Sequence, residues 1–338
     1  MRRSEAVTLK DLAQQLGLSP STVSRVLNDT SEGSSRWASP ETTARIHELA
    51  RELNYTRNPY AASLRTARSN MVGVIAPRLQ DYVFASIYEG ISEAASEHGY
   101  FSIVSSSHDS LQARRSLTDT MLEHRVSGFL FGDARLDTPS FFSDFERRGI
   151  PYVLVSRRLP GQISATGNDW LGGRLAAEHL LDAGCRTFGV LAGRPGASTG
   201  VDRTEGFVET LRAHGIPDEN ITTVYNGFDA QDGRLAIERI LEIAGTPEGV
   251  FATNDFAAIG AKGYLSERGI QTSRDFLLCG YNDTPLATGV NLTSVRSPMH
   301  EIGRHGFTLL LSVLNNEVPE SVQLEPELIV RASSTPAS

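Results

Sequence analysis

Arg25 has the side chain best suited to sequence-reading chemistry in the first part of this chain. If residues 20–28 are helical, Arg25 lies on the outward side with Ser21 and Thr22, whose side chains are short. A guanidinium can donate two hydrogen bonds to guanine O6 and N7, and short hydroxyl side chains allow a helix to approach base edges closely. The pattern therefore indicates a helix surface that could read duplex DNA.

Two helices joined by a tight turn are needed to position this surface. Thr8 is suited to cap the first helix, and Gly17 allows a sharp turn after it. Ser19 offers a second cap, and Pro20 fits the first position of the second helix, where its missing N–H costs nothing. The inward apolar residues are Leu9, Leu12, Ala13 and Leu16, then Val23, Val26 and Leu27. This is the form of a helix-turn-helix, with an ordinary helical hairpin as the alternative.

The following residues add a third helix and a linker. Ser39 and Pro40 repeat the signal of a cap followed by proline, and the apolar residues of 40–53 then share one side of a helix. The preceding loop, 29–37, is polar apart from one tryptophan, and we expect it to be solvated. Residues 58–64 have the length of about two helical turns, which are unstable alone. We expect them to fold only against a partner, with a flexible tether as the alternative.

Charge is distributed unevenly along the chain. The 338 residues carry a net charge of −8, which on average disfavours nucleic acid, but residues 1–68 contain ten Lys and Arg against seven Asp and Glu. That segment therefore carries +3, which leaves −11 for residues 69–338. A basic segment attracts phosphates and an acidic one is repelled by them. We therefore expect only the N-terminal part to bind nucleic acid.

From residue 71 onward, short aliphatic runs alternate with amphipathic helices. The predicted strands are 71–77, 101–106, 128–132, 151–156, 187–192, 222–225, 249–253, 276–281 and 327–332. The predicted helices are 87–98, 111–124, 141–148, 171–183, 204–214, 231–244, 256–268 and 299–314. This array predicts two doubly wound parallel sheets, separated by polar linkers at 157–167 and 283–291. Ligands of such folds bind at the carboxyl ends of the strands, here in the cleft between two lobes.

Several other classes of protein lack their signals in this sequence. Cys185 and Cys279 are far apart and have no metal-ligand spacing, so we expect neither a metal nor a cofactor, and both thiols fit a reducing cytoplasm. The polar residues after the first three lack the apolar core of a secretory signal, and no run reaches the roughly 18 apolar residues of a membrane helix. No dinucleotide-binding, P-loop, GxSxG or HExxH motif is present, which argues against an enzyme.

The segments VTLKDLAQQLGLSPSTVSRVLN, SPETTARIHELARELNY and GYNDTP, together with the α/β array, resemble the lactose repressor/galactose repressor (LacI/GalR) family of transcriptional regulators. The resemblance implies a helix-turn-helix head, a body folded like periplasmic sugar-binding proteins, and a cytoplasmic homodimer that binds a pseudo-palindromic operator in double-stranded DNA. The implied domains are a DNA-binding domain at 1–56, a hinge helix at 57–69, and an effector-binding and dimerisation domain at 70–338. The body would divide into an N-lobe, about 70–160 and 290–318, and a C-lobe, about 161–289 and 319–338.

In this family, the recognition helix reads bases and a hinge helix enters the minor groove. The base-reading positions correspond here to Pro20, Ser21 and Arg25. The hinge leucine that wedges a base step open corresponds to Leu64. The other implied DNA contacts, to phosphates, at caps or in the hinge, are Thr8, Ser19, Thr22, Ser24, Asn28, Tyr55, Asn58 and Ala61. The loop 29–37 is several residues longer than the usual connection in the family.

The family's ligand positions lie at strand ends that face the cleft. They correspond here to Phe84, Ser156, Arg157, Arg203, Phe228, Asn254 and Asn282, with Asp81 and Asn168 less securely placed. Aromatic rings beside Arg, Asn and hydroxyl groups suit a sugar or polyol, because the ring stacks on C–H groups while hydroxyls receive paired hydrogen bonds. The alternative is that the phenylalanines belong to the core, the asparagines to turns and Arg157 to a solvated surface.

The charge of the effector stays open at this point. Ser156, Asn168 and Asn282 stand where the family commonly has Asp, so a phosphorylated or other anionic metabolite is an alternative to a neutral sugar. A body that answers to a protein partner is a second alternative. A solute-binding transport component is a third, which the N-terminal motif opposes. We expect effector binding to move the lobes and so change the spacing of two hinges, with release or promotion of DNA binding as the outcome.

Overall fold

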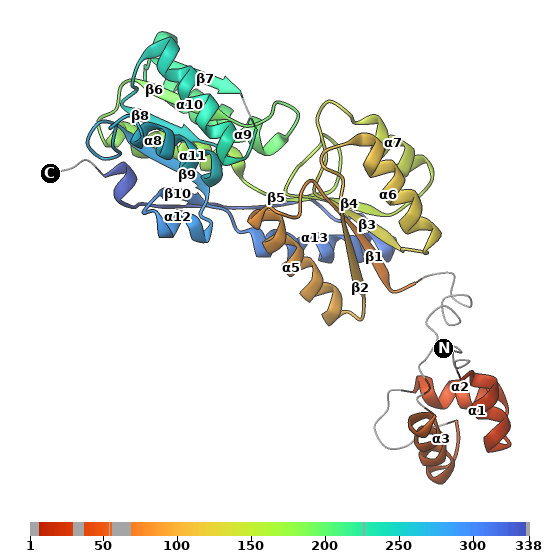
Figure 1. Ribbon diagram of the computed structural model, residues 1–338. Helices are drawn as coiled ribbons and strands as arrows, with labels where there is room; N and C mark the ends of the chain where they lie inside the picture. The colour runs from red at the N-terminus through yellow and green to blue at the C-terminus, as the bar shows by residue number, and fades with distance from the viewer. Residues whose placement is uncertain (1–6, 30–36, 54, 56–68, 226, 336–338) are drawn as a thin grey trace. The chain divides into compact units, whose positions relative to one another are not determined.

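The computed structural model divides the chain into a small helical unit, residues 1–69, and a larger α/β unit, residues 70–338 (Figure 1). It describes residues 7–29, 37–53, 55, 69–225 and 227–335. The predicted hinge residues Asn58, Ala61 and Leu64 lie outside the described residues. In the described part of the chain, no helix has the length and apolar character needed to span a bilayer.

Three helices form the N-terminal unit: α1 (Leu9–Leu16), α2 (Pro20–Asn28) and α3 (Pro40–Glu52). Each begins at its predicted cap, because the hydroxyls of Thr8, Ser19 and Ser39 accept hydrogen bonds from backbone N–H groups of the first turn at 3.1–3.3 Å. The Asp11 carboxylate in turn accepts a hydrogen bond from the Thr8 N–H, which completes a capping box. Gly17 ends α1 with φ 65°, a left-handed conformation that glycine adopts at little cost.

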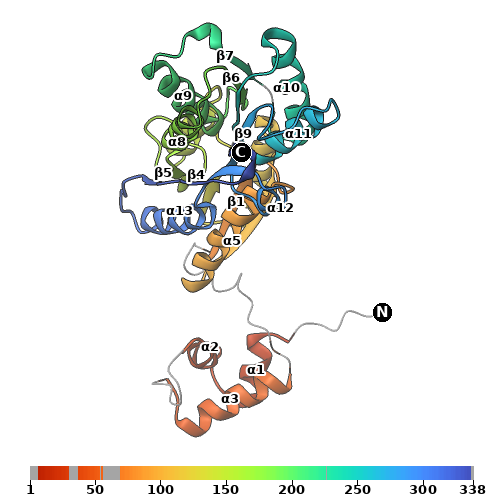
Figure 2. The same ribbon diagram turned by 90° about the vertical axis from the view of Figure 1, so that its left-hand side faces the viewer.

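The three helices, which Figure 2 shows from another side, pack around one small core. Its buried members are Leu12, Ala13, Val23, Val26 and Ile46, with Leu27 and Tyr55 packed at its edge. Burying these residues leaves Ser21 and Arg25 exposed on α2. The predicted helix-turn-helix head is therefore confirmed.

The first sheet of the larger unit has six parallel strands in the order β11-β5-β4-β3-β1-β2. The strands are β1 (Met71–Ala76), β2 (Phe101–Ser106), β3 (Gly128–Phe131), β4 (Tyr152–Val155), β5 (Ser164–Gly167) and β11 (Val322–Leu324). One side is covered by α5 (Tyr82–Glu97) and α13 (Met299–Leu314), the other by α6 (Leu111–Glu123) and α7 (Ser140–Arg147). This three-layer arrangement buries the strands on both sides.

The second sheet also has six strands, in the order β12-β10-β9-β8-β6-β7, and only its β10–β12 pair is antiparallel. The strands are β6 (Phe188–Ala192), β7 (Ile221–Tyr225), β8 (Gly249–Ala252), β9 (Leu277–Asn282), β10 (Thr293–Arg296) and β12 (Glu327–Ile329). One side is covered by α8 (Asp169–Asp182) and α9 (Ser198–Ala213), the other by α10 (Ala230–Ala244) and α11 (Asp255–Ser266). The short helices are η1 (Asp218–Asn220), α12 (Pro285–Gly289) and η2 (Ala332–Ser334).

The chain crosses between the lobes later than the predicted boundaries of 160, 290 and 318. Strand β5 belongs to the first sheet although it lies in the predicted linker, β10 belongs to the second sheet, and β11 returns to the first. These strands have only three or four residues and no aliphatic run. Their strand conformation depends on pairing with a neighbour, which a local pattern does not reveal. The chain therefore changes sheets a few residues after each of the three approximate boundaries.

Two helices begin a turn or more earlier than predicted. Helix α5 begins at Tyr82, where the Asp81 carboxylate accepts a hydrogen bond from the Val83 N–H at 3.0 Å. Helix α9 begins at Ser198, and its first turns bury polar side chains, among them Thr199 and Arg203. Buried polar residues break the apolar pattern by which a helix is recognised. These first turns are the parts of α5 and α9 that line the cavity described next.

Candidate functional site

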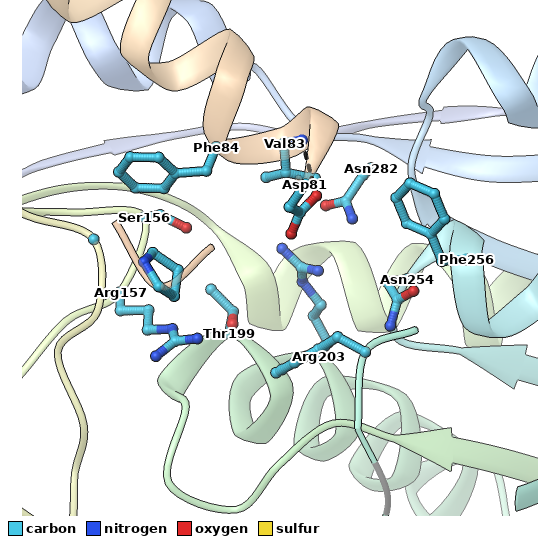
Figure 3. A pocket seen from close by; sticks show the side chains of 13 residues that line it. Asp81, Val83, Phe84, Ser156, Arg157, Thr199, Arg203, Asn254, Phe256 and Asn282 are labelled. Atoms are coloured by element: carbon cyan, nitrogen blue, oxygen red, sulfur yellow. Dashed lines mark hydrogen bonds between the residues drawn. The ribbon is translucent and has the colours of Figure 1, made fainter. Parts of the chain in front are cut away.

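A cavity of about 60 Å³ lies between the lobes, at the carboxyl ends of their strands (Figure 3). The residues that line it are Pro77, Asp81, Val83, Phe84, Gly132, Ser156, Arg157, Thr199, Arg203, Phe228, Asn254, Phe256 and Asn282. All seven residues predicted to bind an effector are among them, and so is Asp81. Asn168 is not; it caps α8, where its Oδ1 accepts a hydrogen bond from the Leu171 N–H at 3.1 Å.

Arg203 is the cation that the C-lobe brings to the cavity, and it is only 6% exposed. Its Nε donates to Asp169 Oδ1 at 2.7 Å, and its Nη1 donates to the Thr253 carbonyl at 2.8 Å. The guanidinium also lies 3.7 Å from the centroid of the Tyr281 ring. A carboxylate, a carbonyl and an aromatic ring therefore hold this side chain in one orientation before any ligand binds.

Arg157 brings a second cation, from the loop after β4. Its Nη1 donates to Asp109 Oδ1 at 2.6 Å, and both side chains are nearly buried. Burial opposes ionisation of Asp109, but the nearby Arg157 guanidinium dominates and lowers the pKa of that carboxyl. Each arginine of the cavity thus has a carboxylate partner that does not line the cavity. The cavity therefore contains arginine donors with little uncompensated positive charge.

Asp81 is an acid that does line the cavity. Burial raises the pKa of its carboxyl, although the hydrogen bond from the Val83 N–H and the charges of Arg203 and Arg157 oppose this rise. Figure 3 shows the Asp81 carboxylate directed toward the Arg203 guanidinium. An acceptor beside a donor is the arrangement that binds vicinal hydroxyl groups.

Asn254 and Asn282 contribute amide atoms that lack partners. Within the described residues, Asn254 Nδ2 and Asn282 Oδ1 are buried without a hydrogen bond. The orientation of Asn254 is set by its Oδ1, which caps α11 by accepting from the Ala257 N–H at 2.9 Å. Leaving a buried donor or acceptor unpaired costs about 1–3 kcal/mol. A ligand that pairs with both amides would recover that cost.

The DNA-binding candidates of the head include exposed residues at and around the start of α2. Pro20, Ser21 and Arg25 are exposed, and Thr22 and Ser24 are half-buried. The Arg25 guanidinium lies 4.6 Å from the centroid of the Trp37 ring, a contact that the sequence did not suggest. The predicted backbone-contact residues Thr8 and Ser19 cap their helices, Tyr55 packs against the core, and Asn28 is the last residue of α2.

Comparisons with known proteins identify the family. The model "Bacterial regulatory proteins, lacI family" matches residues 8–58, and the model of a periplasmic binding protein-like domain matches residues 177–334. The chain belongs to the LacI/GalR family. The HTH-type transcriptional repressors PurR of Edwardsiella ictaluri and of Yersinia pestis are each 28% identical over 333 residues, 96% of both chains. This LacI/GalR protein is thus a DNA-binding transcriptional repressor with an effector-binding domain, and not an enzyme.

Solved structures of the family share the whole architecture. The lac repressor dimer bound to operator and the anti-inducer ONPF has a TM-score of 0.88 at 24% identity, covering 98% of this chain and 100% of that one. The regulator CelR in complex with cellobiose has a TM-score of 0.72 at 28% identity, covering 97% and 99%. The predicted fold, a helix-turn-helix head with a bilobal body like that of periplasmic binding proteins, is therefore confirmed.

Direct contacts join the two lobes of this LacI/GalR protein next to residues that line the cavity. Arg158 forms a two-pronged ion pair with Asp202 of α9, at 2.8 and 2.7 Å. The Arg158 N–H also donates to Ser198 Oγ at 2.9 Å, and the Leu136 N–H to the Gly196 carbonyl at 2.9 Å. Ligand pockets usually measure about 300–1,000 Å³. The cavity of this structure is far smaller, so a sugar-sized ligand requires the lobes to separate or side chains to move.

Asp255 connects the two loops that carry the unpaired asparagines. Its Oδ1 accepts a hydrogen bond from Ser294 Oγ at 2.6 Å, and its Oδ2 accepts from the Thr284 N–H and Oγ1 at 2.7 and 2.9 Å. Because it directly follows Asn254 and anchors the chain two residues after Asn282, it positions both amides. Sequence reasoning missed it; the available signal was a second polar residue at a strand end. Burial raises the pKa of Asp255 to about 6.

The raised pKa of Asp255 predicts that its contribution to stability falls as the pH rises. The folded carboxyl titrates at about 6 and the unfolded one near 3.8, so the folded state binds more protons between these values. Two pKa units correspond to about 3 kcal/mol. Urea unfolding measures the free energy of unfolding of the wild type and of Asp255→Asn at pH 4 and at pH 7. Between these two pH values the wild type should lose up to about 3 kcal/mol of stability relative to Asp255→Asn. A difference that is independent of pH would contradict this prediction.

Proposed function

We propose that this LacI/GalR repressor binds a pseudo-palindromic operator as a homodimer and that a neutral sugar or polyol between its lobes controls the binding. The observation that carries the effector proposal is the pair of unpaired amides, Asn254 Nδ2 and Asn282 Oδ1, in a cavity lined by both lobes. An unpaired donor and an unpaired acceptor in the wall of one cavity match the hydroxyl groups of a sugar. Three phenylalanine rings among the lining residues supply surfaces on which C–H groups stack.

Compensated charge favours a neutral effector over a phosphorylated one. Arg203 and Arg157 already pair with Asp169 and Asp109, and Asp81 adds a carboxyl to the cavity wall. A phosphate group would have to compete for arginine donors that are already bound to carboxylates. Its charge would also be repelled by the Asp81 carboxylate. The cellobiose complex of CelR supports the sugar class.

A purine is the second candidate effector. Its flat ring can stack on phenylalanine, and its edge presents a donor and an acceptor to the amides of Asn254 and Asn282. The similarity to repressors named PurR favours this candidate.

In the proposed mechanism the effector shifts the equilibrium between two arrangements of the lobes. Two heads present Pro20, Ser21 and Arg25 to the two half-sites, and the hinge around Leu64 enters the minor groove between them. A ligand that changes the contacts between the lobes changes the spacing of the two hinges. A coupling free energy of about 1–3 kcal/mol alters operator occupancy roughly 5- to 150-fold.

A ligand screen followed by operator titration tests the proposal. The thermal unfolding of the full chain would be followed with neutral sugars and polyols, with purine bases and nucleosides, and with sugar phosphates. The wild-type chain would be used to select its operator from a random DNA library. Binding of the protein to that operator would then be titrated with and without each stabilising compound. We expect a neutral sugar to raise the melting temperature and to change operator affinity. Stabilisation by sugar phosphates alone, or by a compound that leaves operator affinity unchanged, would contradict the proposal.

Gly132 offers a specific block of the cavity. A Cβ atom at this position would lie 1.9 Å from Phe84 Cε2, so Gly132→Ala should push the phenylalanine ring into the space of the ligand. We expect the compound found in the screen to lose at least about tenfold in affinity, since a displaced buried ring fills part of a small cavity. Calorimetric titration measures the effect.

The matched control is Gly289→Ala, because a Cβ atom there meets nothing within 4 Å. It should bind the compound as the wild type does. Unchanged ligand affinity of Gly132→Ala would exclude this cavity as the effector site.

A further inference from the structure

We propose that Trp37 is a positioning residue for base reading, because its indole holds the Arg25 guanidinium by stacking. This inference rests on the proposed role of Arg25 in reading a base. It gives a function to the last residue of the loop 29–37, which is longer than usual for the family.

The contact joins the loop to the DNA-reading side of α2. Arg25 Cζ lies 4.6 Å from the centroid of the Trp37 ring, within the roughly 6 Å over which a cation is attracted to an aromatic face. Arg25 is exposed, and Trp37 retains 39% of its surface, so the pair lies at the surface of the head. Tryptophan is the strongest of the aromatic partners for such a cation.

The backbone at Trp37 is well anchored. Ala38, the next residue, packs against the core of the head, and Ser39 caps α3 through its hydroxyl, which accepts a hydrogen bond from the Thr42 N–H at 3.2 Å. The indole therefore projects from the start of a helix that packs in the same core as α2. An anchored ring can restrict the rotamers of the arginine that rests on it.

Stacking leaves the arginine able to bind a base. In a stacked pair the indole covers the planar face of the guanidinium, whereas hydrogen bonds to guanine O6 and N7 leave from its edge. Within the residues that the structure describes, no hydrogen bond or ion pair holds the Arg25 guanidinium. Trp37 thus reduces the conformational freedom that Arg25 loses on binding without occupying its donors.

A fluorescence measurement without DNA tests the stack. The chain has two tryptophans, so Trp170→Phe leaves Trp37 as the only indole emitter. In that background, Arg25→Ala should shift the emission of Trp37 and raise its quenching by acrylamide, because one face of the ring becomes open. Lys10→Ala, which removes another exposed charge of the head, is the control and should change neither. Unchanged emission and quenching in Arg25→Ala would overturn the stack.

A double-mutant cycle on DNA tests the positioning role. With DNA selected by the wild-type chain, Trp37→Ala should weaken binding by about two- to fivefold per half-site, and Trp37→Phe should retain most of the affinity. The slope of affinity against salt should not change, because no phosphate contact is lost. In an Arg25→Ala background, Trp37→Ala should have no further effect.

The outcomes separate this inference from the proposed function. Equal binding by Trp37→Ala and wild type would overturn the positioning role, as would an additive loss in the double variant, which would mean that Trp37 contacts DNA itself. If Arg25→Ala leaves base preference unchanged, base reading by Arg25 fails, while the fluorescence result still reports on the stack. The melting temperature of each variant checks that the head remains folded.

Discussion

Replacement of Arg203 by alanine is expected to abolish the response to effector and to lower the free energy of unfolding of the α/β body by about 3–5 kcal/mol. The cost arises because Asp169, buried in the structure, loses the guanidinium that lies 2.7 Å from its carboxylate. The Thr253 carbonyl and the Tyr281 ring lose their partner as well. Urea unfolding followed by circular dichroism measures the stability, and thermal shift with the screened compounds measures the response.

A second substitution distinguishes the buried charge from a simple packing defect. Asp169→Asn in the Arg203→Ala background removes the stranded carboxylate, so part of the lost stability should return while the ligand response stays absent. Arg212→Ala is the control on the same helix, because its ion pair with Asp218 is exposed and contributes little. A ligand response that survives Arg203→Ala would show that the arginine is not part of the effector site.

Replacement of Arg25 by alanine is expected to lower operator affinity by about 1–3 kcal/mol per half-site and to relax the preference at one base pair of each half-site. The reason is that Arg25 is the one long donor on the exposed side of α2, where Pro20 and Ser21 offer only short contacts. Fluorescence anisotropy with the selected operator and with its single-base variants measures both effects.

The control for a general loss of charge is Arg45→Ala, on the exposed side of α3. It should leave base preference as it is in the wild type, since a lost phosphate contact weakens binding to all sequences alike. If Arg25→Ala retains the base preference of the wild type, specificity must come from other residues.

Local sequence signals were sufficient for the head of this repressor. Thr8, Ser19 and Ser39 act as caps, and Gly17 as a left-handed turn, through atoms within a few residues of each other. Such interactions do not depend on the rest of the fold, so a short stretch of sequence reveals them. The alternation of aliphatic runs and helices in the body is similarly visible, because each strand and helix shows its own apolar pattern.

The lobe boundaries and part of the cavity depended on tertiary structure. Strands β5, β10 and β11 are short and become strands by pairing across the chain, so their positions do not follow from local pattern. The first turns of α9 bury polar residues, among them Thr199 and Arg203, and the first turn of α5 leaves Tyr82 and Ala85 exposed, so neither start shows the apolar periodicity of a helix.

The family resemblance predicted seven of the residues that line the cavity. The contacts of Gly132, Asp255 and Trp37 became known only from the packing of the structure. Gly132 matters because a ring lies against its Cα, and Asp255 because it bonds to a loop 29 residues away. Trp37 matters because a helix in the same small core brings Arg25 over its ring. The sequence by itself determined the caps, the helix-turn-helix and the α/β pattern, since those depend on neighbours in the chain. Only the tertiary structure decided which side chains meet, because contacts between distant segments depend on how the elements pack.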